Sequence, residues 1–150
     1  MTMLGNDDRK EITRIFSSQL RDAVTLRFFT QKVSPLSAPA RQCDTCHDAG
    51  ELLAEVTGMS EKLKLEVYDL VADAEQASKF GVDKIPAVVF EGKNKGVVRY
   101  FGIPAGYEFA LLIEDLTDLS QGTTHLGAKT RQRLEELKAP VHIRVLVTPT

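Results

Sequence analysis

Hydrophobic and polar positions along the first part of the chain follow two periods in turn, one typical of helices and one typical of strands. A helical period follows Asn6 and Asp7, either of which can cap a first helix. One face of that helix would carry the apolar residues Ile12, Ile15, Phe16 and Leu20. Strands are expected over 23–30 and over 63–69, and apolar residues alternate with polar ones in the second of these segments.

Further elements are expected in a regular order up to residue 120. The pattern predicts a helix over 43–58 that ends at Gly58, a helix over 73–80 closed by Gly81, strands over 85–91 and 97–101 joined by a hairpin turn, and a helix that begins at Pro104 or Ala105. The order α-β-α-β-α-β-β-α combines a parallel crossover with an antiparallel hairpin. It predicts an α/β thioredoxin-like fold over residues 1–120, in which helices flank a mixed sheet and one extra helix comes first.

Residues 121–150 form a C-terminal helix–strand extension of a different kind. A linker is expected over 121–126, a surface helix over 129–138 and a strand over 141–148. This strand repeats the pattern of the first one, since Val24-Thr25-Leu26-Arg27-Phe28 parallels Val141-His142-Ile143-Arg144-Val145. The repeat suggests the start of a second copy of the same unit. On pattern alone, a chance similarity of two short segments is an equal alternative.

Composition and charge narrow the classes of protein to which the chain can belong. With 150 residues, folding buries roughly 70% of the surface of the unfolded chain, so disulfide bonds are not needed for stability. The net charge is −2 and the basic residues form no run, which argues against nucleic acid as a partner. No apolar stretch approaches the roughly 20 residues of a membrane span, and the N-terminus lacks the pattern of a secretory signal. We therefore expect a cytoplasmic protein that does not bind a membrane.

The two cysteines, Cys43 and Cys46, carry the clearest candidate chemistry. In a reducing cytoplasm, such a pair is more often catalytic, redox-sensing or metal-binding than structural. At the start of a helix, unpaired backbone N–H groups stabilise a thiolate, which is the species that attacks a disulfide. We assign Cys43 as the nucleophile and Cys46 as the thiol that resolves the mixed disulfide. A protonated His47 would favour the thiolate, whereas Asp44 would oppose it.

Three other interpretations of the cysteine pair remain open. Cys43, Cys46 and His47 match the C-x-x-C-H pattern of covalent haem attachment, although such attachment normally needs export and no signal is present. A structural zinc site would need four ligands, and His47, His125 and His142 do not have finger-like spacing. In the third interpretation, the pair is buried and inert. We expect no cofactor and no metal, and the alternatives are a metal- or haem-binding protein and a redox-inert interaction module.

Ile85 and Pro86 lie at the start of a predicted strand, after the cysteines in the sequence. A proline there can simply avoid a lost hydrogen bond in the sheet. In the functional interpretation, Pro86 is a cis proline packed against the cysteines, and Ile85 offers its backbone groups to an extended substrate segment. Arg27 and Lys84 are expected to be solvated rather than catalytic. No acidic residue occurs within the first strand, so a buried carboxylate that relays a proton is not evident.

Two further segments, together with the C-x-x-C motif, resemble a known family. The more specific one is Arg99-Tyr100-Phe101-Gly102-Ile103-Pro104-Ala105-Gly106-Tyr107-Glu108-Phe109, at the last strand and last helix of the first unit. The other is Gly81-Val82-Asp83-Lys84-Ile85-Pro86, which resembles the family's loop into a cis proline. The family is the protein disulfide oxidoreductases of thermophilic archaea and bacteria, also called glutaredoxin-like proteins. The resemblance spans nearly the whole chain.

The resemblance implies two tandem thioredoxin-fold units that act on protein disulfides and serve cell redox homeostasis. Cys43, Cys46 and Pro86 would form the redox site of the first unit, and 121–150 would be the linker, helix and first strand of a truncated second unit. The family also implies a thioredoxin-reductase-like flavoprotein as electron donor. A lone terminal strand would expose an edge, and its exchange with a neighbouring molecule would produce a homodimer.

Overall fold

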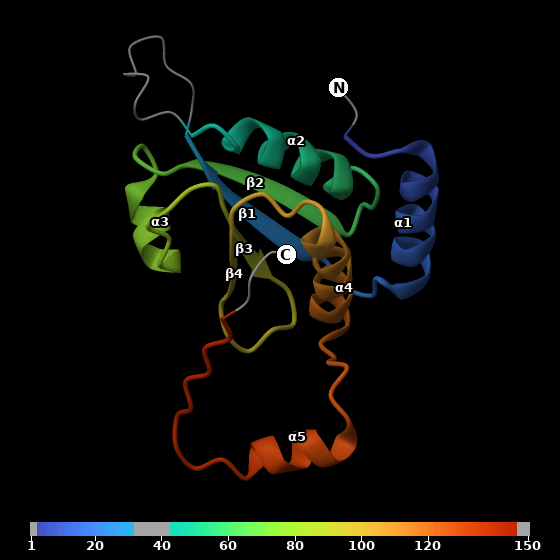
Figure 1. Cartoon of the computed structure of the whole chain (residues 1–150), viewed down its shortest axis with the longest axis vertical. Coiled ribbons are helices and arrows are strands. Elements are labelled where there is room, and N and C mark those ends of the chain that lie inside the picture. The colour runs from blue at the N-terminus through green and yellow to red at the C-terminus, as the bar shows by residue number, and fades with distance from the viewer. Residues whose placement is uncertain (1–2, 32–42, 147–150) are drawn as a thin grey trace.

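The structure is a computed structural model that describes residues 3–31 and 43–146. Its centre is one four-stranded mixed sheet with the strand order β2-β1-β3-β4 (Figure 1). The strands are β1 (Val24–Thr30), β2 (Leu63–Asp69), β3 (Ala87–Glu91) and β4 (Val98–Phe101). β1 pairs in parallel with β2 and antiparallel with β3, and β3 pairs antiparallel with β4. The predicted crossover and the predicted hairpin are therefore both confirmed.

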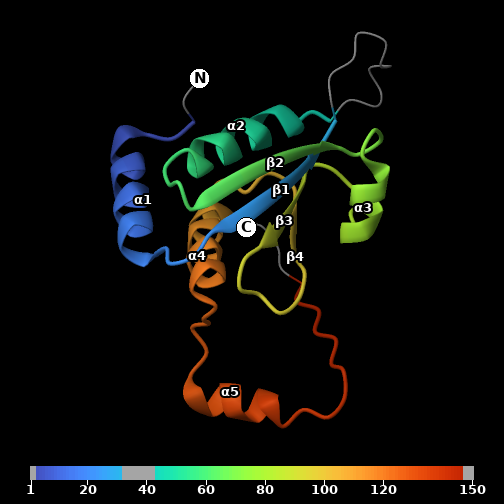
Figure 2. The same ribbon diagram turned by 180° about the vertical axis from the view of Figure 1, so that it is seen from behind.

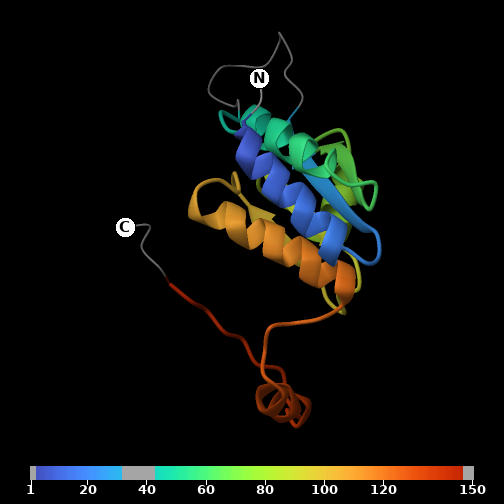
Figure 3. The ribbon, with the colours of Figure 1, turned by 90° about the vertical axis from the view of Figure 1, so that its right-hand side faces the viewer.

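Four helices cover the two faces of the sheet: α1 (Asn6–Gln19), α2 (Cys46–Thr57), α3 (Ala74–Phe80) and α4 (Tyr107–Gln121). A further helix, α5 (Ala128–Glu135), lies apart from the sheet (Figure 1). α1, α2 and α4 lie side by side (Figure 3) and bury the larger core against one face. α3 packs on the other face, at the end of the sheet away from α1 and α4 (Figures 1 and 2). Among the residues that the structure describes, no helix has the length and apolar character needed to cross a membrane.

The first helix is part of the core, as its apolar spacing predicts. The predicted apolar positions that are buried are Ile12, Phe16 and Leu20. The predicted cap is wrong, because Gly5 is the N-cap residue and neither Asn6 nor Asp7 caps the helix. The Gly5 carbonyl already accepts a hydrogen bond from the Arg9 N–H at 3.0 Å, so Asn6 is the first residue inside the helix.

Glu55, on α2, attaches the N-terminal segment to the rest of the unit. Its carboxylate accepts hydrogen bonds from the backbone N–H groups of Met3 at 2.9 Å and Leu4 at 3.2 Å. The Arg9 side chain donates a further one at 2.8 Å, and the Glu55 side chain is 9% exposed. Burial raises the pKa of the Glu55 carboxyl, but its three donors together outweigh burial and hold that pKa below its ordinary value.

We expect the Glu55 contact to stabilise the fold at neutral pH and to lose this effect in acid. A carboxyl whose pKa is lowered on folding stabilises the folded state above its unfolded pKa, near 4.5, and the stabilisation is lost as pH falls through the folded pKa. Urea unfolding of wild type and Glu55→Gln should show a difference in unfolding free energy at neutral pH that shrinks below about pH 4. Glu61→Gln, at an exposed position before β2, is the control. A difference that stays constant with pH would contradict this account.

Arg27 lies in the middle of β1, on the face of the sheet opposite the larger core. Its guanidinium forms ion pairs with Glu66 of β2 and Glu91 of β3, and its central carbon lies 5.1 Å from the centre of the Phe80 ring. Only 18% of the side chain is exposed, so the prediction that Arg27 is solvated is wrong. A residue on a central strand has neighbours from both adjacent strands, which sequence periodicity does not identify. Lys84 is exposed, as predicted.

The segment after α4 extends away from the sheet (Figures 1 and 3). α5 has no buried residue and is shorter than the helix predicted over 129–138. The strand predicted over 141–148 is not formed in its described part, 141–146, which is exposed, and 147–150 lie outside the described residues. A strand needs the backbone groups of a partner, and no strand of the described sheet pairs with this segment. The second unit that we predicted from this segment stays a prediction.

Candidate active site

Cys43 and Cys46 lie where the chain enters α2, after β1. The helix predicted to open at Cys43 begins instead at Cys46, with Thr45 as its N-cap residue. Asp44 and Thr45 form a turn, in which the Cys46 N–H donates to the Cys43 carbonyl at 3.4 Å. Cys43 therefore precedes the first turn of the helix, and Cys46 is the first residue of that turn.

The two cysteines are joined in a disulfide bond, with their Cα atoms 5.4 Å apart. They differ in exposure. Cys46 is 5% exposed, whereas Cys43 is half-buried. A reactant that approaches from solvent therefore reaches Cys43 more readily than Cys46. This difference suits an attacking thiol at Cys43 and a resolving thiol at Cys46.

The start of α2 provides an environment that favours negative charge. Within the described part of the chain, the backbone N–H groups of His47 and Asp48 have no hydrogen-bond acceptor, as is usual in a first helical turn. These donors and the helix dipole stabilise an anion. A cysteine thiol at such a place is therefore more acidic than that of a free cysteine. The His47 ring is exposed, with Nε2 3.5 Å from Glu51 Oε1 on the same helix. Asp44 is also exposed, and its carboxylate opposes a thiolate nearby.

Pro86 lies at the same end of the sheet as the cysteines. Phe29, near the end of β1, pairs with Ala87, the residue after Pro86, and β1 then leads toward Cys43. The peptide bond between Ile85 and Pro86 is cis, Pro86 is buried and Ile85 is half-buried. The fold thus places the predicted site residues from two distant segments at one end of one sheet.

The loop between β4 and α4 lies against this proline. The Gly102 N–H, just after β4, donates to the Pro86 carbonyl at 2.9 Å. Gly102 has a φ of 109° and Gly106 has a φ of 63°, conformations that glycine adopts far more easily than other residues. Both glycines belong to the segment that resembles the family most specifically, and the contact with Pro86 gives that segment a structural role.

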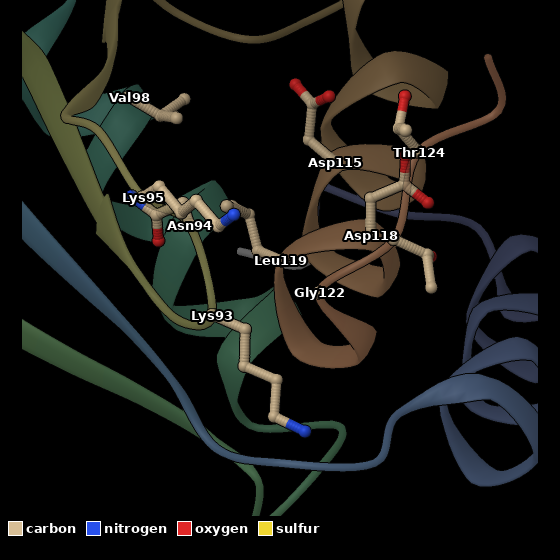
Figure 4. Close-up of a pocket in the computed structure, with 10 residues that line it drawn as sticks. Lys93, Asn94, Lys95, Val98, Asp115, Asp118, Leu119, Gly122 and Thr124 are labelled. Carbon is tan, nitrogen blue, oxygen red and sulfur yellow. The ribbon is translucent and has the colours of Figure 1, made fainter. Parts of the chain in front are cut away.

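The hollow drawn in Figure 4 lies at the other end of the sheet. It has a volume of about 300 Å³ and is bordered by the turn between β3 and β4 and by the end of α4. The Lys93 side chain points away from Asp115 and Asp118 there, and forms an ion pair with Asp22. Across the residues described, no group of three or more His, Cys, Asp and Glu side chains could hold a metal ion.

Comparison with known proteins identifies solved structures that are similar to this chain. No protein-family model and no curated protein matches it. The crystal structure of a protein disulfide oxidoreductase from Aeropyrum pernix is 30% identical, and the match covers 89% of this chain and 55% of that chain with a TM-score of 0.72. The alkylhydroperoxide reductase AhpF from Enterococcus faecalis is 20% identical over 87% of this chain and 59% of that chain, with a TM-score of 0.71. A thioredoxin from Fasciola hepatica is 17% identical over 73% of this chain and 92% of its own, with a TM-score of 0.50.

These matches confirm the predicted fold class, a thioredoxin-like mixed sheet flanked by helices with an extra helix at the N-terminus. The chain spans little more than half the length of the first two relatives, 55% and 59%. The disulfide-bonded pair lies at the start of α2, and the sheet combines the parallel crossover and the antiparallel hairpin that the sequence predicts. The chain therefore has a thioredoxin-like fold, and it is similar in sequence and structure to a protein disulfide oxidoreductase.

Proposed function

We propose that this chain carries out dithiol–disulfide exchange on protein disulfides through Cys43 and Cys46. The observation that supports this best is the unequal exposure of a bonded pair at the start of a helix. Because Cys43 is only half-buried, it can reach a substrate disulfide and attack it. Cys46 is buried, which protects it from side reactions, and it lies within bonding distance of Cys43.

In the reduced protein, the Cys43 thiolate attacks one sulfur of a substrate disulfide. A mixed disulfide forms, the substrate's S–S bond breaks, and the departing thiolate takes a proton. The Cys46 thiol then loses its proton and attacks the Cys43 sulfur, which releases the second substrate thiol. The substrate gains two electrons and two protons, and the chain ends in the Cys43–Cys46 disulfide form that the structure describes.

Ile85 and Pro86 are proposed to bind the substrate's backbone. Among the described residues, no backbone hydrogen bond is made by Ile85, whereas the Pro86 carbonyl is already bonded to Gly102. The free N–H and C=O of Ile85 can pair with an extended segment that carries the substrate disulfide, as when a strand is added to a sheet edge. This pairing would hold the scissile bond near Cys43.

The cycle needs an external reductant to restore the dithiol. We propose a thioredoxin-reductase-like flavoprotein in the cytoplasm for this role, as the family resemblance implies.

We also propose that 121–150 begins a second thioredoxin-like unit. In a homodimer, the segment 141–146 would pair with the sheet of a second copy, which would cover its exposed apolar residues.

The proposed function predicts an acidic Cys43 thiol. In reduced Cys46→Ser, which retains Cys43 alone, the rate of alkylation against pH should report an apparent pKa within about 3.5–7.5, below the free-cysteine value of about 8.5. Cys43→Ser is the matched control, and its buried Cys46 should react far more slowly. A Cys43 pKa at or above the free-cysteine value, together with no reduction of insulin by wild type, would favour a redox-inert interaction module.

A further inference from the structure

The loop between β4 and α4 is held on both sides by buried side chains and backbone hydrogen bonds. The side chain of Pro104 is fully buried, and Ile103 packs against the larger core. The Ala105 N–H donates to the Ile103 carbonyl at 2.8 Å, and the left-handed Gly106 turns the chain into α4. The loop therefore has one well-defined path, and its first residue, Gly102, donates to Pro86.

Tyr100 and Glu108 connect the two ends of this loop. The Tyr100 hydroxyl, from β4, shares its one hydrogen between two acceptors, the Ile103 carbonyl at 3.2 Å and the Glu108 carboxylate in the first turn of α4. Burial, and then the bond to Glu108, raise the pKa of Tyr100, so its hydroxyl stays protonated and remains a donor at physiological pH. The ring borders a small cavity of about 160 Å³ with Phe90 and Leu111.

These contacts form a direct connection from α4 to the proposed substrate-binding residues. The hydroxyl hydrogen of Tyr100 lies between Glu108 and the Ile103 carbonyl, so Tyr100 joins the start of α4 to the loop, and the neighbouring Gly102 donates to the Pro86 carbonyl. The position of the Ile85 backbone relative to Cys43 therefore depends on whether this loop keeps its path.

We propose that Tyr100 and Glu108 are positioning residues for the polypeptide substrate, acting through Gly102 and Pro86. The inference rests on the proposed function, because it concerns the backbone pairing at Ile85. Tyr100 and Glu108 would affect the binding of protein disulfides and take no part in the exchange of sulfur bonds. The reduction of a small disulfide, which does not pair with Ile85, should therefore not depend on Tyr100 or Glu108.

The test compares a protein disulfide with a small one in Tyr100→Phe, which removes the hydroxyl and keeps the ring. For insulin reduction, we expect KM to rise by about threefold to tenfold, with little change in kcat. This is less than the full loss of a hydrogen bond to a charged group, because Tyr100 acts on the substrate only through Gly102 and Pro86. Reduction of dithiobis(nitrobenzoate) and the alkylation rate of Cys43 should be unchanged. Glu108→Ala leaves the Tyr100 hydroxyl bonded to Ile103 alone and should raise KM less than Tyr100→Phe, and Glu108→Gln, whose amide oxygen still accepts from Tyr100, should stay near wild type.

Tyr68→Phe is the matched control, because the Tyr68 hydroxyl is likewise bonded to a carboxylate, that of Glu66 at 3.0 Å, but comes from β2. It should leave the KM for insulin unchanged. A second readout that does not depend on activity is hydrogen exchange of the Gly102 amide, which should be faster in Tyr100→Phe than in wild type.

The outcomes separate this inference from the proposed function. If wild type reduces insulin and Tyr100→Phe either matches it or loses activity equally on both disulfides, the positioning role is overturned and the proposed function stands. If wild type reduces neither disulfide, the proposed function fails and the inference fails with it. Unchanged exchange of the Gly102 amide in Tyr100→Phe would also overturn the inference.

Discussion

Replacing Cys43 with serine is expected to abolish the reduction of protein disulfides, lowering the rate by at least about a thousandfold. A serine hydroxyl stays protonated at neutral pH, so it does not attack a disulfide sulfur in place of the thiolate. The remaining thiol, Cys46, is buried and cannot replace Cys43 as the attacking group. The measurement is insulin reduction with dithiothreitol as the source of electrons, after subtraction of the rate without protein.

Cys46→Ser provides the matched comparison for this prediction. It keeps the attacking thiol and lacks the resolving one, so a mixed disulfide between Cys43 and the substrate should accumulate and be visible by mass spectrometry. The reverse pattern, with adducts at Cys46 and activity retained in Cys43→Ser, would show that the roles of the two cysteines are exchanged. Equal residual activity in both variants would mean that neither residue carries the reaction.

Replacing Phe16 with alanine is expected to lower the free energy of unfolding by about 3–5 kcal/mol, through lost burial and the cavity left behind. Phe16 is 2% exposed and packs in the larger core with residues of α2, α4 and the sheet. Small domains have a total stability of about 5–15 kcal/mol, so this single change would remove a large fraction of it. Urea unfolding of the disulfide-bonded protein, followed by circular dichroism, measures the effect.

Thr13→Ala is the control for Phe16→Ala, since Thr13 lies on the same helix and is exposed. Its effect should stay within about half a kcal/mol. The comparison decides whether the extra N-terminal helix is part of the folding unit or an addition to it. A loss of less than about 1 kcal/mol in Phe16→Ala would mean that α1 can detach while the remaining core stays folded.

Much of the fold could be predicted from local patterns. The alternation of apolar residues over 63–69 predicts β2 with the bounds that the structure has, and the segment 23–30 differs from β1 by one residue. Gly81 ends α3 in the left-handed conformation, as its place after the apolar face indicates. These features depend on residues close in sequence, so they can be identified without knowledge of the partners.

The errors have a common physical origin in contacts that the sequence does not display. Arg27 is mostly buried because the register of β1 with β2 and β3 places two carboxylates beside it. The start of α2 moves to Cys46 because Asp44 and Thr45 form a turn with the cysteine ahead of them. The segment 141–146 has the composition of a strand, but composition without a pairing partner does not produce one.

By itself, the sequence determined the order of helices and strands, the faces that form the core, and the presence of a C-x-x-C motif at the start of a helix. The physical reason is that periodicity, turn residues and cysteine spacing act over a few neighbouring residues. Only the tertiary structure decided which distant groups meet. It places Gly102 on Pro86, attaches the N-terminal segment to Glu55, and buries the Ser120 hydroxyl against the backbone of Asp22. Each of these contacts depends on where the whole chain folds, because the two groups are far apart in sequence.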